Sequence, residues 1–92
     1  MAYMTTHFWP GGTEAQYEAT VAAVHPASGL PAGQTFHVAG PTEGGILITA
    51  VWDSKEQYEK FLHEELLAKT IDGGFVGAPE QRSAEVTNLL SA

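Results

Sequence analysis

Hydrophobic residues recur at two different spacings along this chain, and the two spacings alternate. Residues 3–9 alternate around β-forming side chains and are followed by Pro-Gly-Gly, which marks a turn. Over residues 14–25 the apolar Tyr17, Val21 and Val24 recur at helical intervals. The start of the chain therefore predicts a strand, a tight turn and a helix.

Two further strands are predicted in the middle of the chain. Residues 26–33 contain two prolines and two glycines, which end the first helix. Residues 34–40 and 46–53 are rich in β-forming side chains and are separated by a turn at 41–45. These two strands are close enough in sequence to form an antiparallel hairpin.

A second helix follows Ser54, and its apolar stripe is formed by Tyr58, Phe61, Leu62 and Leu66. The glycine-rich residues 71–79 end this helix, and residues 81–90 predict a last strand. Each helix begins with the spacing of a capping box, Thr13 with Gln16 and Ser54 with Gln57. Two i,i+4 ion pairs are expected on the second helix, Glu56 with Lys60 and Glu65 with Lys69.

The predicted order of elements is β-α-β-β-α-β, and it spans residues 1–92 as a single domain. This order is typical of the α+β ferredoxin-like fold, a four-stranded antiparallel sheet with two helices on one face. The two helices cover one face of the sheet, and the sequence holds no further element to cover the other.

Both faces of the predicted strands are apolar, which is unusual for a sheet with one face in water. A broad exposed apolar patch of this kind is larger than monomers usually have. Burial of about 600 Å2 per subunit would contribute on the order of 15 kcal/mol before association costs. We therefore expect a homodimer in which two sheets pack face to face as a dimeric α/β barrel. A monomer with an apolar sheet surface is the alternative.

The parity of side chains along the strands assigns the two faces. A hairpin turn centred between Thr42 and Glu43 would place His37 opposite Ile48, on the same face as Trp52. Trp52 leads directly into the second helix, so this face is expected to meet the helices. The opposite face is then expected to meet the partner subunit, through Phe8, Phe36, Val38, Leu47 and Val51.

Composition narrows the possible partners and compartments. The formal net charge is −7 and only four residues are Lys or Arg, which argues against nucleic acid or an anionic membrane surface as a partner. The chain has no cysteine, no signal-peptide pattern and no apolar run of membrane-spanning length. A soluble cytoplasmic protein is expected.

The sequence resembles the dimeric α/β-barrel superfamily, and this resemblance covers essentially the whole chain. It is carried by Phe-Trp-Pro-Gly-Gly-Thr-Glu-Ala-Gln-Tyr-Glu-Ala near the start, by residues 25–45, and by Val-Trp-Asp-Ser-Lys-Glu-Gln-Tyr-Glu-Lys-Phe at 51–61. These segments look most like small bacterial proteins similar to antibiotic-biosynthesis monooxygenases. The resemblance implies dimers whose sheets join into a barrel, with a pocket between the sheet and the helices of each subunit.

Within this superfamily, cofactor-independent monooxygenases that oxidise polyketide anthrones have a recurring set of pocket residues. Trp52, Tyr58 and His37 stand at the places of the family's Trp, Tyr and His. The family also has an Asn four residues before the Trp, where this sequence has Ile48, and the only Arg, Arg82, is not at an evidently corresponding place. The haem-degrading branch is disfavoured because no axial His stands near residue 71.

The four histidines have different expected roles. A buried neutral His37 has a pKa suited to a general base, although a core histidine bonded to backbone is the alternative. His7 lies on the same face by parity, about 10 Å away across two strand spacings, and is expected to line the pocket. His25 is expected to interact with the dipole at the end of the first helix, and His63 to be solvated. No metal-binding spacing is present, so no metal or other cofactor is expected.

The expected function is that of a cofactor-free monooxygenase acting on a small aromatic or polyketide-like molecule. His37, alone or together with His7, would remove a proton so that the carbanion reacts with oxygen, and Tyr58 would stabilise the oxyanion. The glycine-rich segment around Phe75 is a candidate lid. The alternatives are a non-catalytic ligand-binding or stress-response dimer, and a cyclase or isomerase using the same pocket. The expected substrate-binding residues are Trp52, Ile48, Tyr3, Thr5, Trp9, Phe61 and Phe75.

Overall fold

The computed structural model describes residues 1–27, 29–68 and 71–91. Its elements are β1 (Tyr3–Pro10), α1 (Glu14–Val24), β2 (Gln34–Thr42), β3 (Gly45–Trp52), α2 (Lys55–Phe61), η1 (Leu62–Leu66) and β4 (Glu80–Glu85). η1 is a π-helical turn that continues α2, in which the Leu67 N–H donates to the Leu62 carbonyl at 2.8 Å. The order is the predicted β-α-β-β-α-β.

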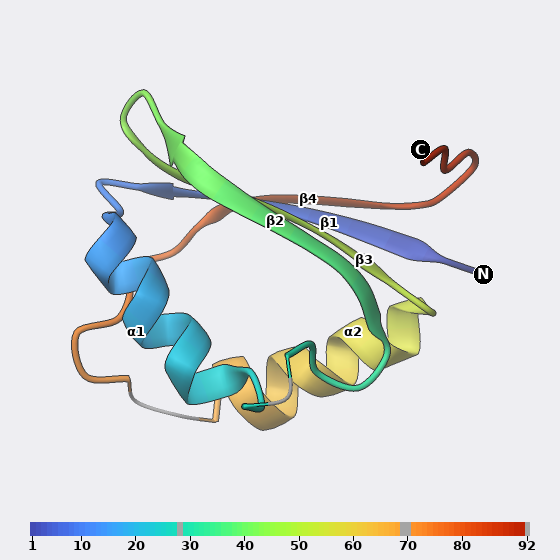
Figure 1. Ribbon diagram of the computed structural model, residues 1–92, viewed down its shortest axis with the longest axis horizontal. Helices are drawn as coiled ribbons and strands as arrows, with labels where there is room; N and C mark the ends of the chain where they lie inside the picture. Colours follow the sequence, from blue (N-terminus) through green and yellow to red (C-terminus); the bar gives the residue numbers. More distant parts are fainter. Residues whose placement is uncertain (28, 69–70, 92) are drawn as a thin grey trace.

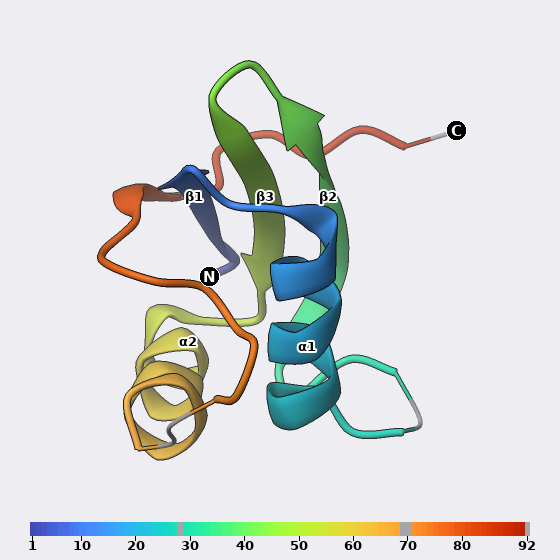
Figure 2. The ribbon, with the colours of Figure 1, turned by 90° about the vertical axis from the view of Figure 1, so that its left-hand side faces the viewer.

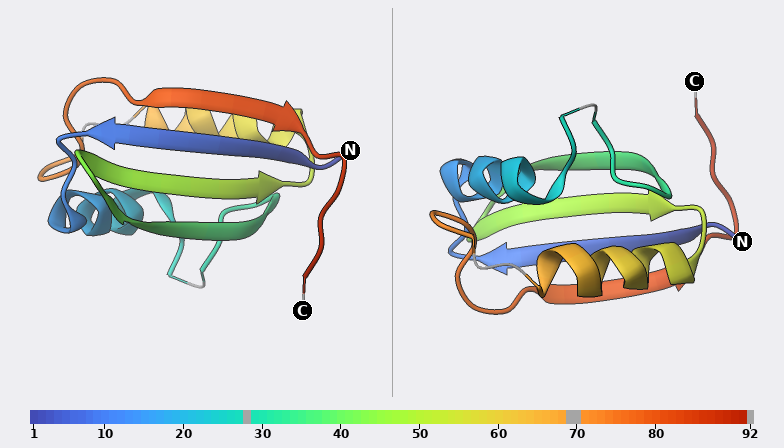
Figure 3. Two further views of the ribbon diagram at one scale, coloured as in Figure 1. Left: turned by 90° about the horizontal axis from the view of Figure 1, so that it is seen from above. Right: turned by 90° about the horizontal axis from the view of Figure 1, so that it is seen from below.

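The four strands form one antiparallel sheet in the order β2-β3-β1-β4, with both helices on one face (Figure 1). Seen along the sheet, α1 lies under the β2 side, whereas α2 lies toward β1 (Figure 2). No described helix covers the opposite face, which is open when the sheet is viewed from above (Figure 3). The predicted ferredoxin-like architecture is therefore confirmed.

Local capping explains where the helices begin. The Thr13 hydroxyl accepts from the Gln16 N–H at 3.1 Å, and the Gln16 side chain accepts from the Thr13 N–H at 3.0 Å. This is the complete capping box predicted from the sequence. Ser54 accepts from the Gln57 N–H at 3.2 Å at the start of α2. The expected pair of Glu65 with Lys69 lies outside the described residues.

The hairpin register differs from the prediction by two residues. Thr42 pairs with Gly45, so the turn is centred between Glu43 and Gly44, one residue later than predicted. His37 therefore lies opposite Ala50, not Ile48. A shift of two residues preserves parity, so His37 still faces the helices. Parity fails only at the start of β2, where an irregularity between Gln34 and Phe36 turns Gln34 inward and leaves Thr35 exposed.

The last strand is shorter than predicted. β4 ends at Glu85, which lies opposite Tyr3, and one further backbone bond joins the Val86 N–H to the Ala2 carbonyl at 2.9 Å. Beyond this point the chain has passed Tyr3, the first residue of β1, and pairs with no strand among the described residues. The predicted strand over residues 81–90 is therefore wrong in its second half, where Leu90 is exposed.

The core lies between the sheet and the helices. Its cluster of buried residues consists of Val24, Ala50, Trp52, Tyr58 and Phe61. The Trp52 ring centroid lies 5.1 Å from that of Phe61 and 5.5 Å from that of Tyr58. Each such aromatic pair contributes about 0.5–1.5 kcal/mol beyond its buried area. Trp52 is therefore both the centre of the core and a fixed wall for the space beside it.

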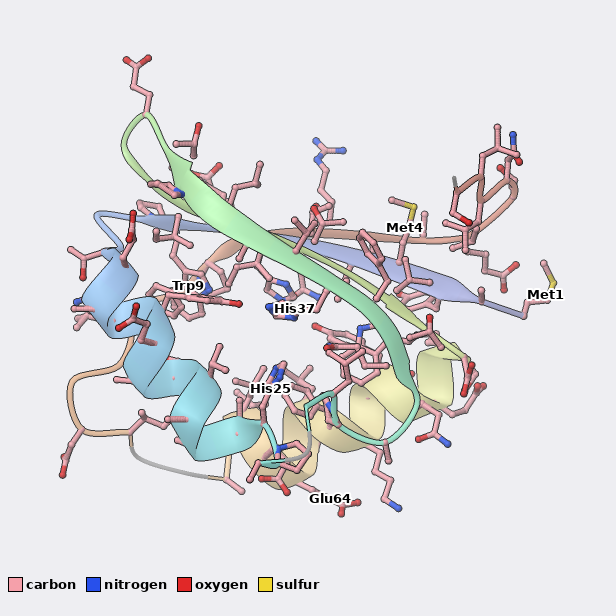
Figure 4. All side chains as sticks on the ribbon, viewed as in Figure 1. Met1, Met4, Trp9, His25, His37 and Glu64 are labelled. Carbon is pink, nitrogen blue, oxygen red and sulfur yellow. The ribbon has the colours of Figure 1, made fainter. Side chains whose placement is uncertain are left out.

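The outer face of the sheet is apolar and open. Phe36, Val38 and Leu47 are 49%, 51% and 45% exposed, whereas Trp52 and Ile46 on the inner face are each 2% exposed. Met4 points to this outer side (Figure 4). Within the described ranges, no helix is long and apolar enough to cross a membrane.

Candidate functional site

A cavity of about 80 Å3 lies between the sheet and the two helices. Trp9 and His37 project from the sheet toward it, and His25 reaches it from the end of α1 (Figure 4). The lining is mostly apolar or aromatic, and none of the described lining residues is Lys, Arg, Asp or Glu. An uncharged cavity of this kind favours a neutral ligand, because no fixed charge compensates for the desolvation of an ionised one.

Nearly all the site residues predicted from the sequence line this cavity. They are His7, His37, Tyr58, Trp52, Ile48, Thr5, Trp9, Phe61 and Phe75. Tyr3 is the exception: its ring lies 6.0 Å from that of Tyr58, and its hydroxyl donates to the Ser83 hydroxyl at 2.7 Å. Tyr3 therefore supports Tyr58 from outside the cavity wall.

One Tyr–His pair is formed by Tyr58 and His7. The Tyr58 hydroxyl lies 3.3 Å from His7 Nε2 and accepts a hydrogen bond from Gln81 Nε2 at 2.6 Å. Gln81 occupies this position because it pairs with His7 across β1 and β4. The Tyr58 hydroxyl thus accepts from Gln81, and its own proton can be donated to His7 or to a ligand.

The other pair is formed by Tyr17 of α1 and His37 of β2. The Tyr17 hydroxyl lies 2.5 Å from His37 Nε2. His37 Nδ1 is buried and has no hydrogen-bond partner among the described residues. When Nε2–H donates to the Tyr17 oxygen, Nδ1 carries the free lone pair of the neutral ring.

His25 extends the Tyr17–His37 pair. Its ring lies edge-on to that of His37 at 4.9 Å and edge-on to that of Phe61 at 6.2 Å. An open groove of about 560 Å3 lies along Tyr17, His25 and His37 on the α1 side, and these three residues also line the cavity. They therefore separate the cavity from solvent.

Burial keeps the histidines of the site neutral. It lowers the pKa of His7, His25 and His37 below the usual value of 6.5. The nearby His25 lowers the pKa of His37 further, whereas a backbone hydrogen bond with Gly29 opposes the effect of burial on His25. Burial raises the pKa of Tyr17 and of Tyr58 above 10.0. At neutral pH the site therefore holds neutral imidazoles beside protonated phenols.

The segment around Phe75 closes one end of the cavity. The Phe75 ring stacks on that of Trp9 at 4.6 Å and 7°, and the Phe75 N–H donates to the Thr20 hydroxyl at 3.3 Å. Gly73 and Gly77 flank Phe75 and have φ values of 75° and 82°, which residues other than glycine rarely adopt. Phe75, the candidate lid residue, therefore forms part of the cavity wall.

Several residues of the site were not predicted, among them His25, Gln81 and Gln34. His25 was assigned to the helix end, although its i,i+4 spacing from Val21 places it on the same helix stripe and was a usable signal. Gln81 follows only from the register of β4, and Gln34 only from the irregularity that turns it inward. His63 is exposed, as predicted. Within the described ranges, no three His, Asp or Glu side chains are grouped to hold a metal ion.

Comparison with known proteins yields structural matches only. No protein-family model and no curated protein sequence matches the chain. A Chloroflexus aurantiacus protein described as an antibiotic biosynthesis monooxygenase is 24% identical with a TM-score of 0.65, over 99% of this chain and 98% of that chain. A variant of SnoaB, a cofactor-independent oxygenase from Streptomyces nogalater, is 16% identical with a TM-score of 0.58, over 99% of this chain and 97% of that chain. At these identities the likeness concerns the backbone, and it shows that the chain shares the ferredoxin-like fold of these two structures.

Proposed function

We propose that this protein is a cofactor-independent monooxygenase-like enzyme that oxidises a small aromatic or polyketide-like molecule in the cavity. The observation that carries this proposal is the buried His37 Nδ1, which has no hydrogen-bond partner among the described residues. Its ring lines a cavity that is also lined by Tyr58 and has no charged side chain among its described lining residues. The fold shared with a cofactor-independent oxygenase supports it. A base, a hydrogen-bond donor and an aromatic wall are the groups that this chemistry needs from a protein.

The first step is removal of a proton from an activated C–H group or a phenol. His37 Nδ1 takes the proton, and Tyr17 holds the other ring nitrogen so that the lone pair remains at Nδ1. The pKa of His37, lowered by burial, leaves the imidazole unprotonated at neutral pH. The same lowered pKa makes the base weaker, so the substrate has to be acidified by its own aromatic system.

The resulting carbanion reacts with molecular oxygen supplied from solution. A carbon–oxygen bond forms, the peroxide takes up a proton, and loss of water leaves a carbonyl where the CH2 group was. The negative charge on the substrate oxygen is stabilised by the Tyr58 hydroxyl, which Gln81 holds in place. Trp52 forms the wall against which the ring packs.

The size of the cavity requires movement for a multi-ring substrate. About 80 Å3 is well below the roughly 300–1,000 Å3 of typical ligand pockets. The Phe75 segment is the part of the wall with flanking glycines, so its displacement from Trp9 would enlarge the cavity at least cost to the core.

Oxygen consumption with a panel of anthrones and hydroquinones tests the proposal. We expect oxygen uptake with quinone formation, and loss of that activity in His37→Ala. Turnover without oxygen uptake would instead favour an isomerase or cyclase, and binding without turnover would favour a ligand-binding protein. Unchanged turnover in His37→Ala would contradict the mechanism.

We also propose that two copies pair through the outer face of the sheet. Phe36, Val38 and Leu47 lie on strands β2 and β3 and are about half exposed in the single chain. No described helix covers the outer face of these strands (Figure 3). We expect a dimer at micromolar concentration by light scattering, and a monomer for Leu47→Lys. Leu67→Lys is the matched control, because Leu67 is 67% exposed at the end of η1 on the helical side. A single subunit for the unsubstituted protein would contradict this proposal.

A further inference from the structure

We propose that Gln34 is the polar anchor of the ligand and accepts a hydrogen bond from its phenolic hydroxyl group. Gln34 is 8% exposed and lines the cavity. Its Oε1 atom is buried and has no hydrogen-bond partner among the described residues. A buried amide oxygen without a partner is rare in folded proteins, and it is a place where a ligand donor would be bound.

The backbone turns Gln34 into the cavity by a local irregularity of β2. Gln34 pairs with Trp52 and Phe36 pairs with the adjacent Val51, so Thr35 is an extra residue in β2. Without this β-bulge, Gln34 would share the outer face with Phe36. Bulges of this kind occur beside active sites and redirect a side chain, at a cost to regular pairing.

Gln34 and His37 are placed to contact the same small ligand. Gln34 lies opposite Trp52 and His37 opposite Ala50, two positions along β3, which corresponds to about 7 Å along the strand. A single aromatic ring that packs on Trp52 is long enough to present a hydroxyl to Gln34 at one end and a reactive carbon toward His37 at the other.

The uncharged lining defines the class of ligand. No cation among the described lining residues faces the cavity to bind a carboxylate or phosphate. The Trp52 indole N–H already donates to the Thr5 hydroxyl at 3.4 Å, and the Tyr58 oxygen already accepts from Gln81. Two buried acceptors that line the cavity have no partner among the described residues, His37 Nδ1 and Gln34 Oε1. With His37 Nδ1 assigned as the base, Gln34 Oε1 is the acceptor for a donor on a neutral hydroxylated aromatic molecule. This inference rests on the proposed aromatic ligand of the cavity.

Phenol and toluene form a matched probe pair, because they differ by a hydroxyl in place of a methyl group. Their binding to the full chain can be followed by NMR shifts of the Trp52 indole, with Gln34→Met and the control Gln57→Met. Gln57 lies on α2 and lines a neighbouring groove, and it does not line the cavity. We expect Gln34→Met to weaken phenol binding about fivefold. Toluene binding should stay within about twofold, and both probes should bind Gln57→Met as they bind the unsubstituted protein.

The Tm of the ligand-free protein is a second measurement, and a merely structural role of Gln34 would change it in the opposite direction. The buried Oε1 of Gln34 has no partner among the described residues. Replacing this side chain by Met, which is similar in size, should therefore raise the Tm by roughly 4–8 °C. A lower Tm would show that Gln34 is a structural residue, which would overturn the inference.

The remaining outcomes separate this inference from the proposed function. Equal binding of phenol to the unsubstituted protein and to Gln34→Met would overturn the role of Gln34 and leave the cavity as an aromatic site. Anisole accepts hydrogen bonds but cannot donate one. If Gln34→Met weakened the binding of anisole and not that of phenol, the requirement for a donor on the ligand would be overturned. Failure of both phenol and toluene to bind the unsubstituted protein would overturn the aromatic site and this inference together.

Discussion

The two Tyr–His pairs of the cavity consist of the same residue types, but their surroundings differ. Tyr58 and His7 lie on the α2 side, where Gln81 donates to the Tyr58 hydroxyl at 2.6 Å. Tyr17 and His37 lie on the α1 side, where His37 Nδ1 is buried without a partner among the described residues. In the first pair the Tyr58 hydroxyl is fixed by a hydrogen bond from Gln81, whereas in the second pair His37 Nδ1 has no such bond among the described residues.

This difference assigns a separate task to each pair. A hydroxyl fixed by a donor is suited to stabilising an oxyanion, because its orientation does not change during the reaction. An imidazole with one nitrogen held and the other free is suited to accepting a proton. The proposed mechanism therefore depends on the pairs not being interchangeable.

The largest expected effect comes from comparing His37→Gln with His7→Gln. A general base contributes about 10²–10⁴-fold in rate, so His37→Gln should lower kcat for oxygen uptake by at least 10²-fold. His7→Gln should lower it by no more than about tenfold, because His7 acts only through Tyr58. Equal losses in the two variants would remove the distinction between the pairs.

A smaller effect is expected from the two tyrosines. Tyr58→Phe removes the donor to the oxyanion and should lower kcat about 10²-fold, with little change in KM. Tyr17→Phe leaves the base in place and removes only its orientation, so a loss of about fivefold is expected. Steady-state kinetics of oxygen uptake would measure both, and a larger loss in Tyr17→Phe would reverse the assignment.

The smallest effect is expected from Gln81→Leu. This substitution leaves the Tyr58 hydroxyl in place but removes the donor that fixes it, so kcat should fall about threefold. The Tyr58→Phe background is the control: there the loss from Gln81→Leu should disappear, because the hydroxyl on which Gln81 acts is absent. Additive losses in the double variant would show that Gln81 acts elsewhere.

Much of the fold follows from the sequence, because strand and helix periods, capping boxes and glycine-rich turns are local signals. The prediction that His37 lies on the sheet face toward the helices is also correct, because the two-residue error in hairpin register preserves parity. The end of β4 was not predictable in this way, because it depends on where β1, far away in sequence, begins.

The site was predictable only in part for the same reason. His7, His37, Tyr58 and Trp52 lie on predicted strand and helix faces and reach the cavity. Gln81 enters the site through pairing of distant strands, and Gln34 enters it through a bulge that reverses the parity of one residue. The pairing of Tyr17, not Tyr58, with His37 depends on where α1 packs across the sheet, which periodicity does not fix.

The pH dependence of kcat/KM for oxygen uptake tests most directly whether His37 is the base. Burial lowers the pKa of His37 below 6.5, so the active neutral form is lost only as the pH falls through that lowered pKa. We therefore predict that kcat/KM rises with pH to a plateau, with an inflection that lies below pH 6.5 and persists in His7→Gln. An inflection that lies above 6.5, or one that survives unchanged in the residual activity of His37→Gln, would contradict the account.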